Sequence, residues 1–427
     1  MPRKEPLRTI KGMRDILPPE SALWNHIEQV AREVFRSYAY DEIRTPLVER
    51  TELFARGVGQ DTDIVTKEMY SFEDRDGQSL TLRPEATASV VRSYIEHGLH
   101  NEPGLNRFFY LGPMFRRERP QKGRYRQFYQ IGAEAIGSES SNVDAEMISV
   151  AIKLLKDLDV TGSSLWLNSV GCPVCRPKYL ETLRKELGTV RGQLCEDCQR
   201  RSETNPLRVL DCKVPQDQPI IEKLPAIAEL LCEDCKKHFS DLQSSLHVYG
   251  IDFTLQPRLV RGLDYYTRTT FEVVHGGLGA QNSLLGGGRY DGLSEALGGP
   301  PVPGVGFSIG EDRLASVVPP LGKEPYLSIA WIGEIGGLAH QHATNLAMEL
   351  RQRKLLRWVK LESQRPKKAY EVADRLSDRY HVYVLIVGDQ EANKGSYEVK
   401  DMTTKEKLVK TREELAQFLE EKVSQSQ

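Results

Sequence analysis

Residues 107–134 read RFFYLGPMFRRERPQKGRYRQFYQIGAE, and this stretch decides the fold of the chain. It holds seven arginines and lysines, with Glu118 as the one acid in its interior. The runs at 108–112 and 127–137 have the aromatic and β-branched content of strands, and the charged segment between them predicts a long hairpin loop. So dense a basic loop indicates a bound polyanion, although a charge run by itself is usually a solvated hairpin.

Arg116 stands where the first predicted strand gives way to the polar loop. A guanidinium held at a strand end is stiff and can donate to two phosphate oxygens at once. The pattern F-R-x-E-R-P, followed by G-R-x-R-x-F-x-Q-x-G-x-E, resembles motif 2 of class II aminoacyl-tRNA synthetases. Because this pattern is much narrower than a charge run, it favours the polyanion site over the solvated hairpin.

The length and composition fit an enzyme of several parts. A chain of 427 residues exceeds one ordinary core, so two or three domains are expected. Because the net charge is −2, a nucleic acid has to be met by local basic patches. The sequence contains neither an apolar signal segment nor a run of about 18 apolar residues, so we expect a cytoplasmic protein with no membrane partner. Its seven cysteines would then be thiols or metal ligands.

The texture of the sequence predicts three segments before a linker. Residues 1–168 mix an amphipathic helix at 21–38 with short strands, which is typical of an α+β domain. Residues 169–250 carry three C-x2-C pairs and helical stretches such as 220–231, and we interpret them as an inserted, largely helical domain. Alternating strands return in 251–318, and the stretch VVPPLGKEP at 317–325 is typical of a linker.

Residues 325–427 have the rhythm of a compact α/β domain. Near the end of this segment a hairpin is predicted at 396–410. The last helix is predicted to begin at Thr411, with Glu414 completing a capping box. Before the hairpin, strands are predicted at 326–332, 355–361 and 382–387, with helices at 338–354 and 367–377.

Four further segments resemble one family of class II enzymes, the histidyl-tRNA synthetases. TLRPEATAS at 81–89 is similar to the substrate-binding turn of that family, and GVGFSIGEDRL at 304–314 resembles motif 3, a strand running into a helix. RGLDYYTRTTFE at 261–272 and LGGGRYDGL at 285–293 resemble the two signatures that set the family apart. The order of the segments agrees from end to end. Ala86 and Tyr129 depart from the pattern, where glycine and histidine are expected.

The resemblance implies the architecture of the class. The catalytic domain is expected to be α+β with a mostly antiparallel sheet, and the C-terminal α/β domain is expected to bind the anticodon. Class II active sites are built beside a dimer interface, so the resemblance also implies a homodimer with Pro46 as the motif 1 proline.

The resemblance further implies the ligation of histidine to tRNA(His) with ATP and Mg²⁺, through a histidyl adenylate. Arg116 and Arg261 would be the catalytic pair on the α-phosphate, with Arg261 doing what a second metal ion does in related synthetases. No side chain demands the role of general base in the transfer step, where the adenylate's own phosphate oxygen is a plausible acceptor. The ATP-binding set is Arg116, Glu118, Phe128, Arg261 and Arg313, with Arg313 and Phe128 on the two sides of adenine.

Recognising histidine requires a pocket that pairs both ring nitrogens, because a substrate that leaves buried polar groups unpaired is rejected. Glu134 and Tyr266 fit that task, while the cationic amino group needs acceptors. The histidine-binding set is Glu85, Thr87, Gln130, Glu134, Tyr265 and Tyr266.

A second hypothesis belongs to a different class of protein. Synthetase-like regulatory subunits of histidine biosynthesis bind rather than ligate, and they typically lack the C-terminal domain and erode the ATP and tRNA motifs. This chain has the domain and retains Arg116, Arg261 and Arg313, so the sequence favours the ligase.

Two basic segments are candidates for contact with tRNA. The loop at 117–126 could meet the acceptor end, and the segment 351–368 carries eight basic residues against Glu362 alone. That segment includes Trp358, which either stacks on an unpaired base or is a core tryptophan beside a solvated helix end.

The cysteines have the spacing of a structural zinc site. Cys172-x2-Cys175, nineteen residues and Cys195-x2-Cys198 fit C-x2-C-x15–20-C-x2-C, and Cys232-x2-Cys235 adds a third pair. The insertion varies within the family, however, and zinc is not a general requirement there. The sequence therefore leaves open whether Cys172, Cys175, Cys195 and Cys198 bind a structural Zn²⁺.

Overall fold

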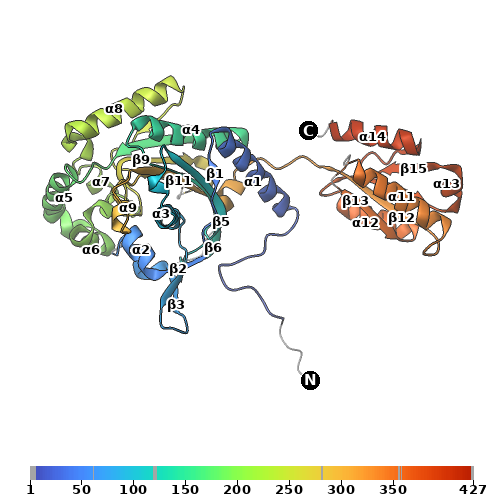
Figure 1. Cartoon of the computed structure of the whole chain (residues 1–427), viewed down its shortest axis with the longest axis horizontal. Coiled ribbons are helices and arrows are strands. Elements are labelled where there is room, and N and C mark those ends of the chain that lie inside the picture. Colours follow the sequence, from blue (N-terminus) through green and yellow to red (C-terminus); the bar gives the residue numbers. More distant parts are fainter. Residues whose placement is uncertain are drawn as a thin grey trace. The chain divides into compact units, whose positions relative to one another are not determined.

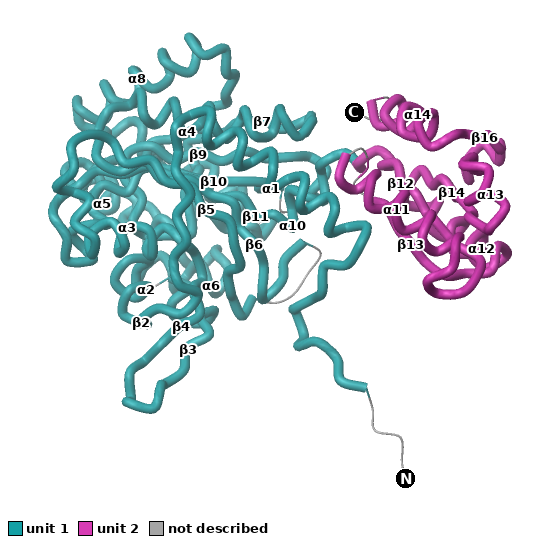
Figure 2. The backbone as a smooth tube through the Cα atoms, turned by 45° about the vertical axis from the view of Figure 1, so that its right-hand side comes forward, with its two compact units in different colours: residues 1–319 teal, residues 320–427 magenta. Residues whose placement is uncertain are grey.

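The computed structural model describes residues 6–60, 62–118, 123–279, 282–353, 356 and 358–424. The chain divides into two compact units, Met1–Pro319 and Pro320–Gln427, which Figure 2 shows in two colours. Each unit has its own sheet and its own apolar core. Among the described residues, no helix combines the length and the apolar character needed to cross a membrane.

The larger unit is built on an eight-stranded sheet with the order β1-β5-β6-β11-β10-β9-β7-β8 (Figure 1). All neighbouring pairs are antiparallel except the two edge pairs, β1–β5 and β7–β8. The predicted mostly antiparallel α+β sheet is therefore confirmed. Its strands are β1 (Asp41–Glu42), β5 (Asn106–Phe115), β6 (Gln127–Ile136), β7 (Ser163–Ser169), β8 (Thr254–Leu255), β9 (Thr267–His275), β10 (Ser283–Arg289) and β11 (Gly304–Gly310).

The predicted amphipathic helix forms as α1 (Glu20–Ser37). Ile27, Ala31 and Val34 recur every three or four residues, so they share one buried face. Phe35 extends this face and stacks on Phe109 of β5, with ring centroids 4.8 Å apart. Together with α4 (Ser141–Asp157), α1 supplies the helical side of the main core beneath the sheet.

A smaller three-stranded sheet with the order β2-β4-β3 stands beside the main sheet. The turn after β4 leads directly into α3, which places residues 85–87 at a helix start. These elements are β2 (Val48–Arg50), β3 (Tyr70–Glu73), β4 (Ser79–Leu82), α2 (Thr51–Val58), α3 (Thr87–Glu96), α9 (Leu293–Ala296) and α10 (Glu311–Ala315).

The segment between β7 and β8 is largely helical and has a core of its own. It comprises α5 (Arg176–Val190), α6 (Glu196–Thr204), α7 (Gln218–Ile221) and α8 (Glu233–Val248). The predicted helix at 220–231 is wrong, since α7 ends at Ile221 and only a 3-10 turn follows at Ile227–Leu230. Pro225 explains the break, because proline removes a helical donor and disfavours helical geometry in the residue before it.

The smaller unit carries a five-stranded sheet with the order β13-β12-β14-β15-β16. Its first three strands are parallel and the last two are antiparallel, which confirms the predicted α/β alternation and hairpin. Thr411 N donates to Glu414 Oε2 at 2.8 Å and Glu414 N donates to Thr411 Oγ1 at 3.4 Å, so the capping box is also confirmed. The elements are β12 (Pro325–Trp331), α11 (Leu338–Gln352), β13 (Trp358–Ser363), α12 (Pro366–Leu376), β14 (His381–Val387), α13 (Asp389–Lys394), β15 (Ser396–Asp401), β16 (Lys407–Thr411) and α14 (Arg412–Ser424).

A buried ion pair joins α4 to the sheet. The side chains of Asp144 in α4 and Arg289 in β10 both have 0% exposure, and Arg289 Nε lies 3.1 Å from Asp144 Oδ1. Arg289 Nη1 also donates to Ser138 O at 2.8 Å, and Thr269 Oγ1 donates to Asp144 Oδ2 at 2.5 Å. Each charge is therefore both paired and hydrogen-bonded, which is the condition for burying it.

Replacing Asp144 should expose the cost of that burial. We expect Asp144→Ala to lower the free energy of unfolding of the larger unit by about 3–5 kcal/mol, because Arg289 is left charged and unpaired inside the protein. Denaturant unfolding followed by circular dichroism measures the loss. Asp157→Ala removes a solvent-accessible partner of Lys153 and should cost about 0.5 kcal/mol. Equal losses in the two variants would contradict the importance of the buried pair.

Candidate active site

One pocket of the larger unit gathers every residue that the sequence motifs assign to histidine or ATP. The residues come from the turn before α3, the ends of β5 and β6, the loop before β9 and the start of α10. They are Glu85, Thr87, Arg116, Glu118, Phe128, Gln130, Glu134, Arg261, Tyr265, Tyr266 and Arg313. The structure thus brings the separate motifs together, while the role of each residue stays a prediction.

Strand β6 forms the floor of the pocket with alternate side chains. Phe128, Gln130 and Glu134 lie on the pocket face, because successive side chains of a strand point to opposite sides. The other face carries Ile131 and Ala133 into the core with α1. One strand therefore serves both the core and the site.

Glycines in the neighbouring strands make room for the polar side chains. Gly306 of β11 pairs with Glu134, and a methyl group at position 306 would overlap Glu134 Oε2. In β10, a methyl group at Gly286 would overlap the guanidinium of Arg261. The Gly-rich motifs are therefore needed here for space at the floor of the pocket.

Glu134 is held at the closed end of the pocket with 1% exposure. It accepts hydrogen bonds from Thr87 Oγ1 at 2.6 Å and from Tyr290 Oη at 2.7 Å. Burial raises the pKa of Glu134 to about 8, and the two hydroxyl donors oppose that rise. Its two oxygens are each oriented by one hydroxyl, which leaves further lone pairs to face the cavity.

Glu85 forms the second acidic group at this end. Its oxygens accept from the backbone N–H groups of Thr87 at 2.8 Å and Ala88 at 2.9 Å, which fixes it at the start of α3. Burial raises the pKa of Glu85 as well. Gln130 lies nearby, and its Oε1 has no hydrogen-bond partner among the described residues. This end of the pocket therefore offers acceptors.

The same pocket also contains basic side chains. Arg116 leaves the end of β5, donates from Nε to Pro84 O at 2.8 Å and lies 5.3 Å from the ring centroid of Phe128. Arg261 forms an ion pair with Glu272, which holds its guanidinium on the wall. Arg313 Nη1 donates to Ser283 O at 2.5 Å, and burial lowers the pKa of Arg313. Three anchored guanidinium groups thus face one cavity.

The two departures from the family pattern do not disturb the pocket. Ala86 has a φ of −111°, which any residue with a side chain can adopt, so glycine is not required there. Tyr129 lies on the core face of β6 and packs edge-on against Trp24 of α1, with ring centroids 5.2 Å apart. Its ring therefore points away from the cavity.

Three tyrosines that line the pocket, Tyr110, Tyr125 and Tyr290, were not among the predicted site residues. Tyr290 donates to Glu134, and Tyr110 of β5 lies opposite Gly132 and lines the cavity. Tyr290 stands inside the quoted LGGGRYDGL segment, so its place in that segment was a usable signal. Tyr110 could have been found from the alternation of side chains along β5, because alternate residues of that strand lie on the pocket face.

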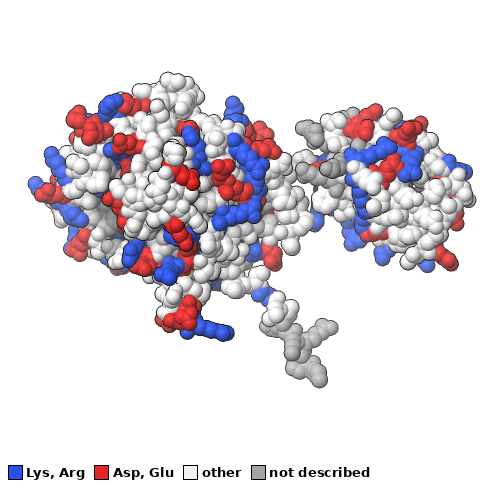
Figure 3. Space-filling model, viewed as in Figure 1, with Lys and Arg blue, Asp and Glu red and all other residues white. Residues whose placement is uncertain are grey.

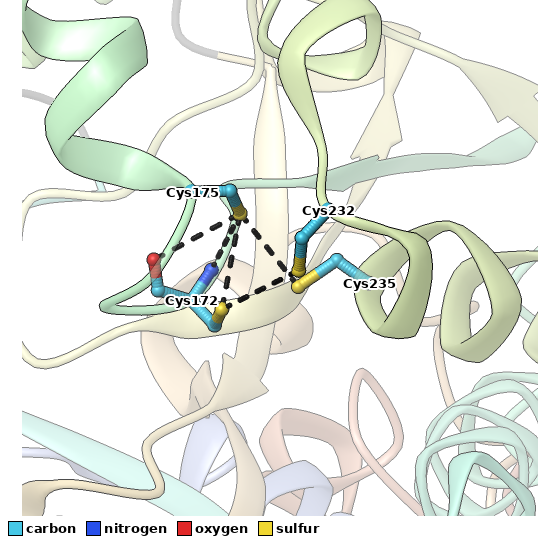
Figure 4. Close-up of side chains that lie close together, drawn as sticks. All are labelled: Cys172, Cys175, Cys232 and Cys235. Atoms are coloured by element: carbon cyan, nitrogen blue, oxygen red, sulfur yellow. Dashed lines mark hydrogen bonds between the residues drawn. The ribbon is translucent and has the colours of Figure 1, made fainter.

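The expected cysteine grouping is wrong. Cys172 and Cys175 lie with Cys232 and Cys235, while Cys195 and Cys198 lie with Cys212 and Asp217. Figure 4 shows the first group, in which thiols from the start of α5 and the start of α8 converge. The physical reason is that the core of this segment folds the start of α8 back onto the start of α5, which sequence spacing cannot reveal.

Comparison with known proteins places the chain. A family model described as histidyl-tRNA synthetase matches residues 12–175 and 181–314, and one described as anticodon binding domain matches 317–422. The chain belongs to the histidyl-tRNA synthetase family. The predicted resemblance to this class II family is confirmed, as is the anticodon-binding type of the C-terminal domain.

Relatives and solved structures agree over nearly the whole length. The histidine–tRNA ligase of Solibacter usitatus is 56% identical over 416 residues, covering 97% of this chain and 99% of that protein. The histidine–tRNA ligase of Koribacter versatilis is 50% identical, covering 97% and 96%. The apo histidyl-tRNA synthetase of S. aureus has a TM-score of 0.76 at 35% identity, covering 97% of this chain and 100% of that one. The alternative of a regulatory subunit is not favoured by these matches.

The buried carboxyl of Glu134 should be visible in the pH dependence of stability. Between its ordinary pKa of 4.5 and its folded pKa of about 8, the folded chain holds a proton that the unfolded chain has lost, so the wild type loses stability as pH rises. Glu134→Gln lacks this group. We expect its free energy of unfolding, relative to wild type, to rise by at most about 1.4 kcal/mol per pH unit in this window and to level off above it.

Denaturant unfolding of the ligand-free protein at a series of pH values measures this difference. The exposed Glu139 provides a control, and Glu139→Gln should keep a constant offset from the wild type. A constant offset for Glu134→Gln as well would show that Glu134 ionises normally in the folded protein.

Proposed function

We propose that this pocket activates histidine with ATP before the histidyl group passes to tRNA. The observation that carries the proposal is that one pocket holds two buried carboxyl groups, Glu85 and Glu134, together with the arginines Arg116, Arg261 and Arg313. The chain ligates histidine to its tRNA, a function supported by its family and by ligases that match it at up to 56% identity among those compared.

In the first step, a carboxylate oxygen of histidine attacks the α-phosphorus of ATP. The new O–P bond forms as the bond from that phosphorus to the bridging oxygen breaks, and pyrophosphate leaves with the electron pair. Negative charge increases on the α-phosphate oxygens and on pyrophosphate, so fixed cations stabilise the transition state. Arg116 and Arg261 are proposed for the α-phosphate, since each is anchored at the pocket wall by a partner from another segment.

ATP is taken up as its Mg²⁺ complex, in which the metal is part of the substrate and offsets phosphate charge. Arg313 and Phe128 are proposed to hold the adenine between them. Glu118 is proposed to receive the adenine amino group, and Arg124 Nη1 already orients its carboxylate through a 2.8 Å hydrogen bond.

Histidine is proposed to enter with its ring toward Glu134 and Tyr266. Glu134 would accept from one ring nitrogen, and the Tyr266 hydroxyl would pair with the other. The amino group is assigned to Glu85, Thr87 and the unpartnered Oε1 of Gln130, with Tyr265 lining the cavity. A side chain of similar size without both ring nitrogens would leave these buried groups unpaired.

In the second step, the terminal 3′ hydroxyl of the tRNA attacks the adenylate carbonyl carbon, and AMP leaves. We assign no protein group as the base. The loop at 117–126 is proposed to meet the acceptor end; its residues 119–122 lie outside the described part of the chain.

The smaller unit is proposed to bind the anticodon through its basic segment at 351–368. Lys354 and Arg357 of this segment lie outside the described residues. Arg351, Trp358 and Lys360 border one surface hollow, and Trp358 is 41% exposed, so it is not a core tryptophan. An exposed indole beside cations suits a stacked base. Figure 3 shows both charges interspersed on the visible face, which agrees with local recognition.

The remaining assignments are also proposals. The catalytic domain is taken as 1–168 with 251–318, the insertion as 169–250 and the anticodon domain as 325–427. The cytoplasm is the proposed location, because tRNA charging serves translation. The thiol groups of the insertion are proposed to hold structural zinc, apart from the chemistry.

A homodimer is proposed with Pro46 near its interface. Leu47 and Val48, which follow Pro46, are 43% and 39% exposed and leave neighbouring apolar surface in contact with water. Covering them with a second copy would remove that surface from water.

The assigned role of Arg261 predicts a specific kinetic loss. Histidine-dependent exchange of ATP with pyrophosphate should proceed in the wild type and fall about 10²–10³-fold in Arg261→Ala, because transition-state charge loses one fixed cation. Arg44→Ala removes a guanidinium that is 79% exposed and should leave the exchange unchanged. No exchange in the wild type would overturn the proposed reaction, whereas an undiminished rate in Arg261→Ala would overturn only its role.

The dimer can be tested by sedimentation. The wild type should sediment with twice the mass of the chain, and the double variant Leu47→Asp, Val48→Asp should shift toward the single-chain mass, because two carboxylates would be buried. Leu255 is 50% exposed at the sheet edge, and Leu255→Asp should remain dimeric. A wild type that sediments as one chain would contradict the proposal.

A further inference from the structure

The insertion collects all seven cysteines of the chain into two groups. Group A is Cys172, Cys175, Cys232 and Cys235; group B is Cys195, Cys198, Cys212 and Asp217. Within each group, the four candidate ligand atoms lie within 4.8 Å of one another. Each group therefore offers four ligand atoms to a single point.

The sulfur spacing in group A has the size of a zinc tetrahedron. Three Sγ–Sγ distances, Cys172–Cys175, Cys172–Cys232 and Cys175–Cys235, are each 3.8 Å (Figure 4). Four sulfurs at about 2.3 Å from a central Zn²⁺ are separated by about 3.8 Å along each tetrahedral edge. A disulfide would require about 2.05 Å, and all of these cysteines are free thiols.

The backbone of group A also suits thiolates. Cys172 N donates to Cys175 Sγ at 3.3 Å, which orients one ligand from within its own turn. Cys232 precedes α8 and Cys235 lies in its first turn, where N–H groups and the helix dipole favour negative charge. The two C-x2-C pairs therefore come from two separate turns and meet at one point, which is a common arrangement in structural zinc sites.

Group B has three sulfurs and one carboxylate. Cys195 Sγ and Cys212 Sγ are 3.9 Å apart, and Cys212 Sγ lies 3.2 Å from Asp217 Oδ2. The other oxygen of Asp217 accepts from Cys195 N at 3.0 Å, which is the outer support expected for a ligating carboxylate. Asp217 is fully buried, and no lysine or arginine pairs with it among the described residues. A buried carboxylate beside three thiol groups is a suitable ligand for a cation.

We infer that this chain binds two structural zinc ions, one at Cys172, Cys175, Cys232 and Cys235 and one at Cys195, Cys198, Cys212 and Asp217. This inference rests on the proposed zinc in the insertion and fixes its stoichiometry and ligands. The ions would link separate parts of the insertion, whose helices pack around a small apolar core. They have no part in the attack on ATP.

The first zinc site also supports the histidine pocket. Arg176 follows the ligand Cys175 and donates from Nε to Val170 O at 3.0 Å and from Nη2 to the backbone oxygen of Tyr266. Tyr266 is proposed to read the substrate ring. Loss of the ion at group A should therefore loosen one wall of the pocket and raise the KM for histidine more than it lowers kcat.

Native mass spectrometry of the full chain, purified without chelators and supplied with Zn²⁺ alone, tests the inference. We expect two zinc ions per chain in the wild type and one in Cys235→Ser and in Asp217→Ala. The control Asp211→Ala removes a nearby carboxylate paired with Arg208 and Lys213, and it should retain two. Fewer than two zinc ions in the wild type, bound iron, or disulfides in place of metal would overturn the inference.

A variant that fails to fold would leave the wild-type stoichiometry as the deciding measurement. Replacement of zinc by Co²⁺ adds a second readout, because the thiolate-to-cobalt absorption should report seven thiolates across the two sites. A spectrum for four thiolates only would remove group B. Pyrophosphate exchange distinguishes the two proposals. A wild type that binds no zinc when Zn²⁺ is supplied, yet shows normal exchange, overturns the zinc sites alone. A wild type that binds two zinc ions but shows no exchange overturns the pocket assignment alone.

Discussion

The buried pair of Asp144 and Arg289 is the constraint on which the site depends. Arg289 is the last residue of β10, and all three of its guanidinium nitrogens donate hydrogen bonds. These bonds restrain the backbone at this point. The next residue is Tyr290, whose hydroxyl lies 2.7 Å from Glu134. An ion pair in the core therefore sets the angle of the carboxylate at the closed end of the pocket, although neither charge of the pair contacts the cavity.

The burial of Glu134 costs stability, and under the proposed function it also provides selectivity. Burial raises its pKa to about 8, so the surroundings of this carboxyl group disfavour its charged form. In the proposed binding mode, a ring N–H of histidine would donate a charge-assisted hydrogen bond to this carboxylate. Gly306 is needed because a larger residue would occupy the space of the carboxylate itself. The proposed selectivity for histidine therefore rests on a buried carboxyl group whose charged form a ring N–H would stabilise.

The sequence could predict those parts of the molecule that local pattern controls. The strand pair around 116, the amphipathic α1 and the α/β alternation after 325 follow from periodicity and composition, and the motifs place eleven residues that do meet in one pocket. The spacing of residues in the sequence could not show which distant segments lie together in the fold. Cys172 finds Cys232 because the insertion folds back on itself, and Tyr290 reaches Glu134 because β11 lies between β10 and β6. The helix expected at 220–231 failed because one proline outweighed its apolar pattern.

The pocket has two kinds of wall, and they differ in what holds them. The floor of β6, β10 and β11 belongs to the interior of the sheet, where strand pairing and the core fix it on both sides. The wall at Tyr265 and Tyr266 is a loop, and its apolar contacts are with the core of the insertion and also with Tyr290, which follows β10. Arg176 ties that loop to the start of α5 through Tyr266 O. The proposed contact with the histidine ring therefore depends on the insertion as well as on the sheet, which gives a physical reason for a small, cysteine-rich segment to be cross-linked.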